Sequence, residues 1–129
     1  MHRTTITQAR ELLNSKKLSS VQLTEAVFAR IDAVEDKVKA FTHLMREKAI
    51  EQAKAADVRI SKGEEQPLLG VPIALKDLIC TQGSRTTCAS KILDQFIAPY
   101  NATVVNRLNA AGAVTVSYTH LTLPTIYSV

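Results

Sequence analysis

Residues 69–90, LGVPIALKDLICTQGSRTTCAS, decide how this chain is organised. The apolar first part is typical of a buried strand, yet it carries the charged residues Lys76 and Asp77. Because side chains alternate along a strand, these two charges point to opposite faces and cannot neutralise each other directly. A buried lysine without a partner would sooner lose its proton, and a neutral lysine is a competent general base. The alternative is that Lys76 closes the strand and extends its ammonium group into water.

The segment 81–90 that follows this strand is rich in hydroxyl side chains, and Gly83 permits a tight turn within it. A loop at the carboxyl end of a strand is a common place for a ligand site in α/β proteins. An ordinary solvated loop has the same composition, so the residue types leave both interpretations open.

Three helices are predicted before this strand. Thr5 can cap a helix over residues 6–15, and Ser19 with Gln22 forms a capping-box pattern at the start of the second helix. The apolar face of the second helix consists of Leu23, Val27, Ile31, Val34 and Val38. Residues 46–61 form the third, whose small inward face consists of Ala49, Ala53, Ala56 and Ile60. The small size of these side chains predicts close packing.

The connection between the second and third helices predicts a short strand over residues 39–44. Glu35 and Lys39 are spaced to pair on the outer face of the second helix.

A fourth helix follows the hydroxyl-rich segment. Asn101 or Thr103 can cap it, and Gly112 is placed to end it. Its apolar face consists of Val104, Leu108 and Ala111. Another apolar strand begins at Ala113 and Val114, and a helix, a glycine and a strand in this order start a parallel α/β unit.

The composition excludes several classes of protein. The 129 residues are 46% hydrophobic and 22% charged, which is typical of a globular domain. A net charge of +4, spread along the chain, is too small to require a nucleic-acid partner. The N-terminus lacks the apolar core of a secretion signal, and no apolar run is long enough to span a bilayer. We therefore expect a cytoplasmic protein without a membrane partner.

Cys80 and Cys88 have neither metal-ligand spacing nor histidines nearby. Two reduced thiols are therefore expected, and no metal site is predicted.

Four segments carry a family resemblance: GVPIALKDLI at 70–79, SRTTCASKIL at 84–93, PYNATVV at 99–105 and RLNAAGAV at 107–114. In this order and spacing they resemble the amidase signature family, and the resemblance extends over about residues 6–114. It implies an α/β fold with a mixed sheet flanked by helices. Only the N-terminal part of that fold is expected here, with the rest truncated.

Within this family the chain is most similar to the A subunits of the tRNA-dependent amidotransferases. That resemblance implies a protein that hydrolyses glutamine to ammonia without a cofactor of its own. Two other subunits, B and C, would complete a heterotrimer that uses ATP and Mg to convert glutamate on mischarged tRNA(Gln) into glutamine. A free-standing amidase of the same family and a non-catalytic interaction or nucleic-acid-binding module stay open as alternatives.

The resemblance also assigns site residues. Members of the family hydrolyse amides with a serine nucleophile, a second serine in a cis peptide bond, and a lysine base. Lys76 matches that lysine, and Asp77 matches the residue after it, which we interpret as structural support. Thr86, Thr87 and Ser90 would lie near the pocket as substrate-binding residues.

The end of the chain departs from the family pattern. Residues 1–114 are interpreted as the N-terminal part of the amidase domain, and residues 115–129 as a non-native tail. The segment VSYTHLTLPT at 116–125 back-translates to DNA that resembles a transposase-type sequencing adapter. The alternative is a genuine divergent strand and tail, and an independently amplified locus encoding the same residues would refute the artefact.

We predict that the 129-residue chain does not hydrolyse glutamine, because the glycine- and serine-rich segment that holds the two catalytic serines of the family is absent from it. Open sheet edges should also leave the isolated chain marginally stable or prone to aggregation. Ammonia release by the purified chain, measured with a coupled dehydrogenase assay, checks the first expectation. Hydrolysis above the buffer background would contradict it.

Overall fold

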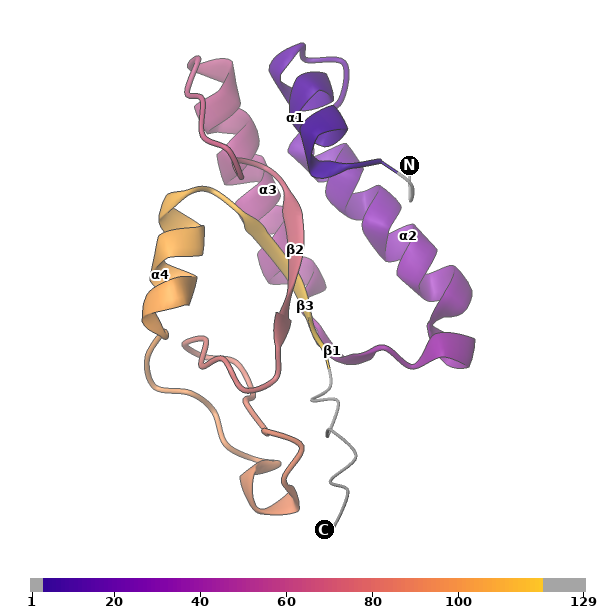
Figure 1. The fold of residues 1–129 in the computed structure, drawn as a ribbon, viewed down its shortest axis with the longest axis vertical. Helices are drawn as coiled ribbons and strands as arrows, with labels where there is room; N and C mark the ends of the chain where they lie inside the picture. The colour runs from indigo at the N-terminus through magenta and orange to yellow at the C-terminus, as the bar shows by residue number, and fades with distance from the viewer. Residues whose placement is uncertain (1–3, 120–129) are drawn as a thin grey trace, which may run out of the picture.

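The computed structural model describes residues 4–119, which form a three-stranded mixed sheet packed against four α-helices (Figure 1). The strands are β1 (Phe41–Leu44), β2 (Pro72–Lys76) and β3 (Val114–Thr119), in the order β1-β3-β2. Strand β2 runs parallel to β3, and β1 runs antiparallel to it. The predicted parallel unit and the mixed sheet are thereby confirmed.

Strand β3 lies in the middle of the sheet, and its residues from Val114 to Tyr118 are all buried. A central strand covered on both faces has no polar side, so a continuous buried run replaces the alternation seen in half-exposed strands. Val114 and Val116 pack against the helices, while Tyr118 lies in a separate cluster with Leu75 and Val105.

Helices α1 (Ile6–Asn14) and α2 (Ser20–Val38) both begin at capping boxes. The Thr5 side chain accepts a hydrogen bond from the Gln8 amide, and the Ser19 side chain accepts one from the Gln22 amide. Both predicted starts are confirmed, since each cap satisfies amides that the helix itself leaves without partners.

The end of α2 differs from the prediction. Lys39 takes a left-handed backbone conformation with φ of 49°, which removes its side chain from the helical position expected opposite Glu35. The Glu35 carboxylate instead accepts a hydrogen bond from the Phe41 amide at 2.7 Å. This contact fixes the turn into β1, and the expected pair of Glu35 with Lys39 was wrong.

Helix α3 (Arg46–Ser61) has the predicted bounds and the predicted buried face. Ala49 and Ala53 are fully buried beside Phe28, Ile31 and the strand β3. Figure 1 shows α3 behind the sheet, where small side chains allow its backbone to approach closely.

Helix α4 (Thr103–Ala110) corrects the sequence prediction at its start and on its face. Its N-cap is Ala102, and no side chain caps it, because Asn101 accepts a hydrogen bond from the Gln82 amide instead. Val105 is the buried residue, whereas Val104 is 45% exposed. The Asn101 side chain also donates to Asn106 Oδ1 at 3.1 Å, so it ties α4 to the segment after β2 without capping the first turn of the helix.

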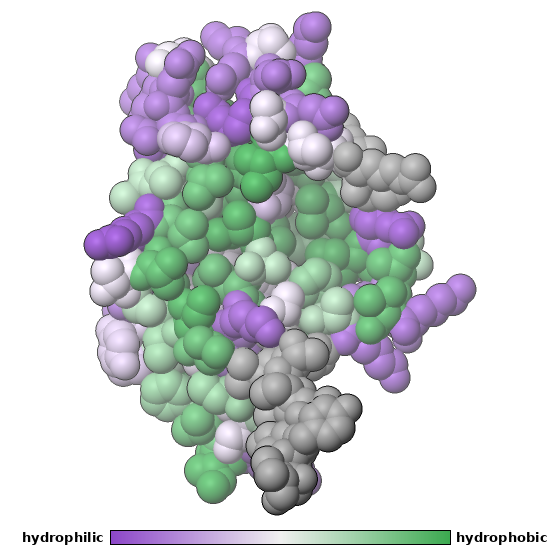
Figure 2. All heavy atoms as spheres, viewed as in Figure 1, coloured by the Kyte–Doolittle hydropathy of each residue, from purple (hydrophilic) through white to green (hydrophobic). Residues whose placement is uncertain are grey.

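Hydrophilic and hydrophobic residues lie in separate regions of the surface shown in Figure 2. Hydrophilic side chains gather at one end, around the ends of α1 and α3, and hydrophobic side chains cover the middle of the visible face over β2. Large exposed apolar residues occur beyond β2 as well, among them Leu78, Ile92, Ile97 and Tyr100. Within residues 4–119, no helix combines the length and the apolar character needed to cross a membrane.

Two segments cross closely where β2 and β3 begin. The Gly70 amide donates to the Gly112 carbonyl at 2.8 Å, and the Val114 amide donates to the Val71 carbonyl at 2.9 Å. A Cβ on Gly112 would lie 2.3 Å from Leu69 Cδ1 and 3.3 Å from Leu69 Cα. Because Leu69 is completely buried, it has no room to move away.

Arg59 closes the same end of the molecule. Its Nη2 donates to the Ala110 carbonyl at 3.1 Å and its Nε donates to Glu64 at 2.8 Å. The hydrogen bond from Arg59 lowers the pKa of the Glu64 carboxyl group below its usual range.

We predict that Gly112→Ala lowers the free energy of unfolding by about 3 kcal/mol or more, because it adds a steric clash to the strain of a left-handed backbone. Gly63→Ala is the matched control: Gly63 has a similar φ of 83°, but a Cβ there would meet nothing within 4 Å. The control should lose only about 1 kcal/mol, from backbone strain alone. Urea denaturation of the parent chain and the two variants measures both values. Equal losses would show that the clash with Leu69 adds nothing to the cost of backbone strain.

Candidate active site

Lys76 and Asp77 have opposite environments at the end of β2. Strand β2 ends at Lys76, which is exposed, whereas Asp77 is only 2% exposed. Of the two interpretations of Lys76, the described residues agree with the one in which the lysine closes the strand and its side chain reaches the surface. The alternation of the two side chains accounts for the difference.

Asp77 is held by the loop that follows. Its Oδ1 accepts a hydrogen bond from the Thr87 amide at 2.9 Å, and its Oδ2 accepts one from the Thr87 hydroxyl. Its main-chain carbonyl accepts a hydrogen bond from the Cys88 amide at 2.8 Å. A buried carboxylate must be satisfied by donors, and Thr87 supplies two of them.

The hydroxyl-rich segment is folded rather than solvated. Its main chain pairs with a later segment, since the Gly83 amide donates to Ala98 and the Thr86 amide donates to Phe96. Arg85 forms an ion pair with Asp94 next to this pairing. The hydroxyl residues Thr81, Ser84 and Thr86 are all buried. No sequence signal predicts this pairing, because it joins residues 10 to 15 positions apart without a periodic pattern.

The three predicted substrate-binding residues differ in their contacts. Thr86 is 2% exposed, and its hydroxyl has no hydrogen-bond partner among residues 4–119. Thr87 is half-buried and bonded to Asp77. Ser90 is half-buried, and its amide donates to the Thr87 carbonyl at 2.8 Å. The structure thus joins Asp77, Thr87 and Ser90 in one hydrogen-bonded unit beside Lys76, while Thr86 lies in the interior.

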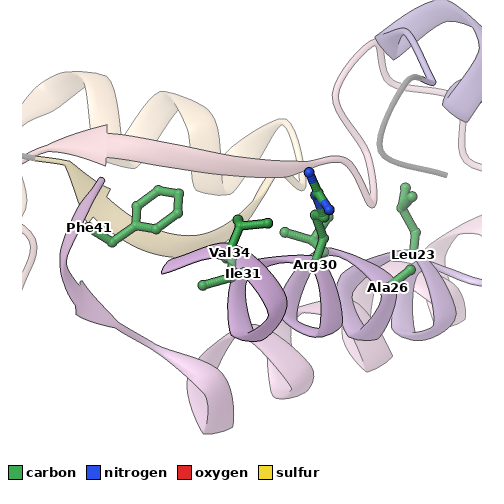
Figure 3. Close-up of a pocket in the computed structure, with 7 residues that line it drawn as sticks. Leu23, Ala26, Arg30, Ile31, Val34 and Phe41 are labelled. Carbon is green, nitrogen blue, oxygen red and sulfur yellow. The ribbon is translucent and has the colours of Figure 1, made fainter. Parts of the chain in front are cut away.

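Two of the cavities that lie outside this unit differ in character. An apolar groove of about 300 Å³ runs along α2, and its lining includes Leu23, Ala26, Arg30, Ile31 and Val34 of α2 and Phe41 of β1 (Figure 3). A polar cavity of about 310 Å³ lies between α3, the segment after β2 and α4, with Lys48, Gln52 and Asn109 in its lining. Neither lining contains Lys76, Asp77, Thr86, Thr87 or Ser90.

The part of the chain that the structure describes contains neither a metal-ligand cluster nor a disulfide. No three His, Cys, Asp or Glu side chains there are grouped as metal ligands. Cys80 and Cys88 are both free thiols.

Comparison with known proteins decides the family. The model of the amidase family matches residues 22–124 of this chain, which include β2, the hydroxyl-rich loop and the hydrogen-bonded unit around Asp77. The chain belongs to the amidase family. Its fold class, an α/β mixed sheet flanked by helices, is the one expected from the sequence.

Curated relatives carry a more specific name. The A subunit of the glutamyl-tRNA(Gln) amidotransferase of Desulfosudis oleivorans is 54% identical over 110 residues, which are 85% of this chain and 23% of the relative. The protein of the same name from Azotobacter vinelandii is 56% identical over 114 residues, which are 88% of this chain and 24% of the relative. The chain therefore spans about a quarter of the length of these relatives.

Solved amidase structures share the fold. The peptide amidase of Stenotrophomonas maltophilia is 30% identical with a TM-score of 0.84, over 91% of this chain and 24% of that enzyme. A protein described in connection with the origins of an s-triazine catabolic enzyme is 34% identical, also with a TM-score of 0.84, over 91% of this chain and 26% of its own.

The predicted boundary at residue 114 stays a prediction. Residues 115–119 continue the central strand β3, and the match to the amidase family extends to residue 124. The rest of the predicted non-native tail, residues 120–129, lies outside the described residues.

We predict that Thr86→Val and Thr87→Val change stability in opposite directions. Thr86→Val removes a buried hydroxyl without a described partner and should stabilise the chain by about 1 kcal/mol. Thr87→Val removes a donor to a buried carboxylate and should cost about 2 kcal/mol. Thermal unfolding of the two nearly isosteric variants measures the difference, and a loss of stability in Thr86→Val would indicate that its hydroxyl has a partner.

Proposed function

We propose that this chain is the N-terminal part of the A subunit of a glutamyl-tRNA(Gln) amidotransferase. The supporting observation is an identity of about half, 54% and 56%, to curated relatives of that name. Most of this chain takes part in each match, so the similarity is not confined to one motif.

In the proposed activity the complete protein hydrolyses the side-chain amide of glutamine. The ammonia released would pass to subunits B and C, which would use ATP and Mg to convert glutamate on mischarged tRNA(Gln) into glutamine. The glutamine-hydrolysing protein itself would need no cofactor, and the complex would act in the cytoplasm.

Lys76 would act as the base in this reaction. Its position at the exposed end of β2 leaves the side chain accessible to a serine supplied by the remainder of the domain. A lysine that becomes desolvated beside a serine hydroxyl loses its proton more readily, and it can then remove the proton of the nucleophile. Asp77 would support the site, and Thr86, Thr87 and Ser90 would lie near the substrate.

A free-standing amidase is the second candidate. It is favoured by the structural similarity to peptide amidase, which shares the fold at 30% identity. The higher identity to the amidotransferase relatives makes the tRNA-dependent function the better supported of the two.

The test uses the complete reading frame from the source locus, expressed with the candidate B and C subunits. Formation of Gln-tRNA(Gln) from Glu-tRNA(Gln), glutamine and ATP supports the proposal. Hydrolysis of small amides without any tRNA product would favour the free-standing amidase, and loss of both activities in a folded complex would refute both.

We predict that Lys76→Ala lowers kcat for glutamine hydrolysis in that complete enzyme by about a thousandfold, within the range typical of a lost general base. Lys76→Arg should fail equally, because arginine keeps the charge but does not deprotonate. Lys54→Ala, at an exposed position on α3, is the control and should keep full activity. Substantial activity in Lys76→Arg would show that the charge of Lys76, rather than its basicity, is required.

A further inference from the structure

Asp77 is buried, and it accepts several hydrogen bonds from the loop after β2. The proposed proton transfer by Lys76 does not by itself require these hydrogen bonds. The Asp77 side chain receives the amide and the hydroxyl of Thr87, and its carbonyl receives the Cys88 amide. Its own amide donates to the Thr119 carbonyl at 3.0 Å, which continues the hydrogen bonding between β2 and β3. Asp77 therefore fastens the loop to the end of the sheet, one residue beyond Lys76.

This loop contains a backbone conformation at Cys88 and Ala89 that is unfavourable for residues with a side chain. Cys88 and Ala89 have φ of 50° and 55°, two successive left-handed residues without a glycine. Each such residue costs about 1 kcal/mol or more, so the surrounding contacts must impose this conformation. Those contacts converge on Thr87, whose hydroxyl oxygen also accepts a hydrogen bond from the Ala89 amide at 3.3 Å and whose carbonyl accepts one from Ser90.

We propose that Asp77 is a positioning residue of the active site: through Thr87 it imposes the strained backbone of Cys88 and Ala89 and so fixes residues 86–90 beside Lys76. This inference rests on the proposed function for the role of Lys76. It differs from a direct role of Asp77 in proton transfer, because within the described residues the side-chain hydrogen bonds of Asp77 come from Thr87.

The positioning role also explains why Thr87 donates both its amide and its hydroxyl group to the Asp77 carboxylate. The Thr87 amide alone would hold the main chain at one point. The amide and hydroxyl together bind both oxygens of the Asp77 carboxylate and so fix the orientation of Thr87 relative to it. An asparagine at position 77 keeps the size and one acceptor but loses the second carboxylate oxygen. Thr87→Ser keeps both donors, and Thr87→Val keeps only the amide.

The first experiment needs no activity and uses the complete protein. We expect Asp77→Asn and Thr87→Val to accelerate hydrogen exchange of the residue 88–90 amides by about tenfold or more beyond any acceleration in α3, whose exchange reports the change in global stability. Thr87→Ser should exchange like the parent chain. If Asp77→Asn unfolds the chain, the comparison of Thr87→Val with Thr87→Ser still decides the question. Unchanged exchange at residues 88–90 in the folded variants would overturn the proposal.

The second experiment measures glutamine hydrolysis by the complete enzyme, at a temperature where circular dichroism shows every variant folded. Asp77→Asn and Thr87→Val should lower kcat by about tenfold or more, with KM within about twofold, and Thr87→Ser should restore kcat. Full kcat in Asp77→Asn, together with inactive Lys76→Ala, would overturn the positioning role and leave the proposed function standing. Full activity in Lys76→Ala would instead refute the proposed role of the base, and with it the positioning role that rests on it.

Discussion

The contact between Leu69 and the main chain of Gly112 is the constraint on which the described fold depends. It brings the start of β2 against the start of β3, so that the Gly70 and Val114 amides begin the pairing of these strands. The helices are tied to the same point: Arg10 of α1 donates to the Leu69 carbonyl, and Ser20 of α2 donates to the Gly70 carbonyl. A side chain at position 112 would separate these elements, which is why a glycine is needed where the backbone also takes a positive φ.

This crossing sets the position of the candidate site at the other end of the strands. Parallel pairing of β2 with β3 fixes Lys76 opposite Thr119 and carries Asp77 just past the last strand residue. Alternation then sends the two neighbouring charges to different environments, one exposed and one buried. A lysine that acts as a base needs access to a hydroxyl group, whereas a carboxylate that organises a loop needs to be buried and fully bonded. Two adjacent residues of opposite charge can meet both needs because their side chains point to opposite sides of the extended chain.

The loop over residues 81–98 has an organisation of its own. This long connection has one short 3₁₀ helix, η1 (Lys91–Leu93). Its backbone pairing, the Arg85–Asp94 ion pair and the hydrogen bonds to Asp77 give it a defined conformation. The exposed apolar residues on and after this loop, and the hydrophobic middle of the face in Figure 2, are more extensive than single scattered side chains. They agree with the expectation that the isolated chain is marginally stable.

The sequence by itself determined the elements whose signals are local. The capping boxes at Thr5 and Ser19 and the alanine spacing of α3 depend on neighbours within about one helical turn, and their prediction needed nothing else. The motifs around Lys76 were likewise sufficient to predict the family. Only the tertiary structure decided which member of the Lys76–Asp77 pair is buried, that Asn101 binds Gln82 rather than capping α4, and that Thr87 fastens the loop. These outcomes depend on groups brought together across turns and loops, where the competing hydrogen bonds have similar strength and the arrangement of the surrounding elements selects among them.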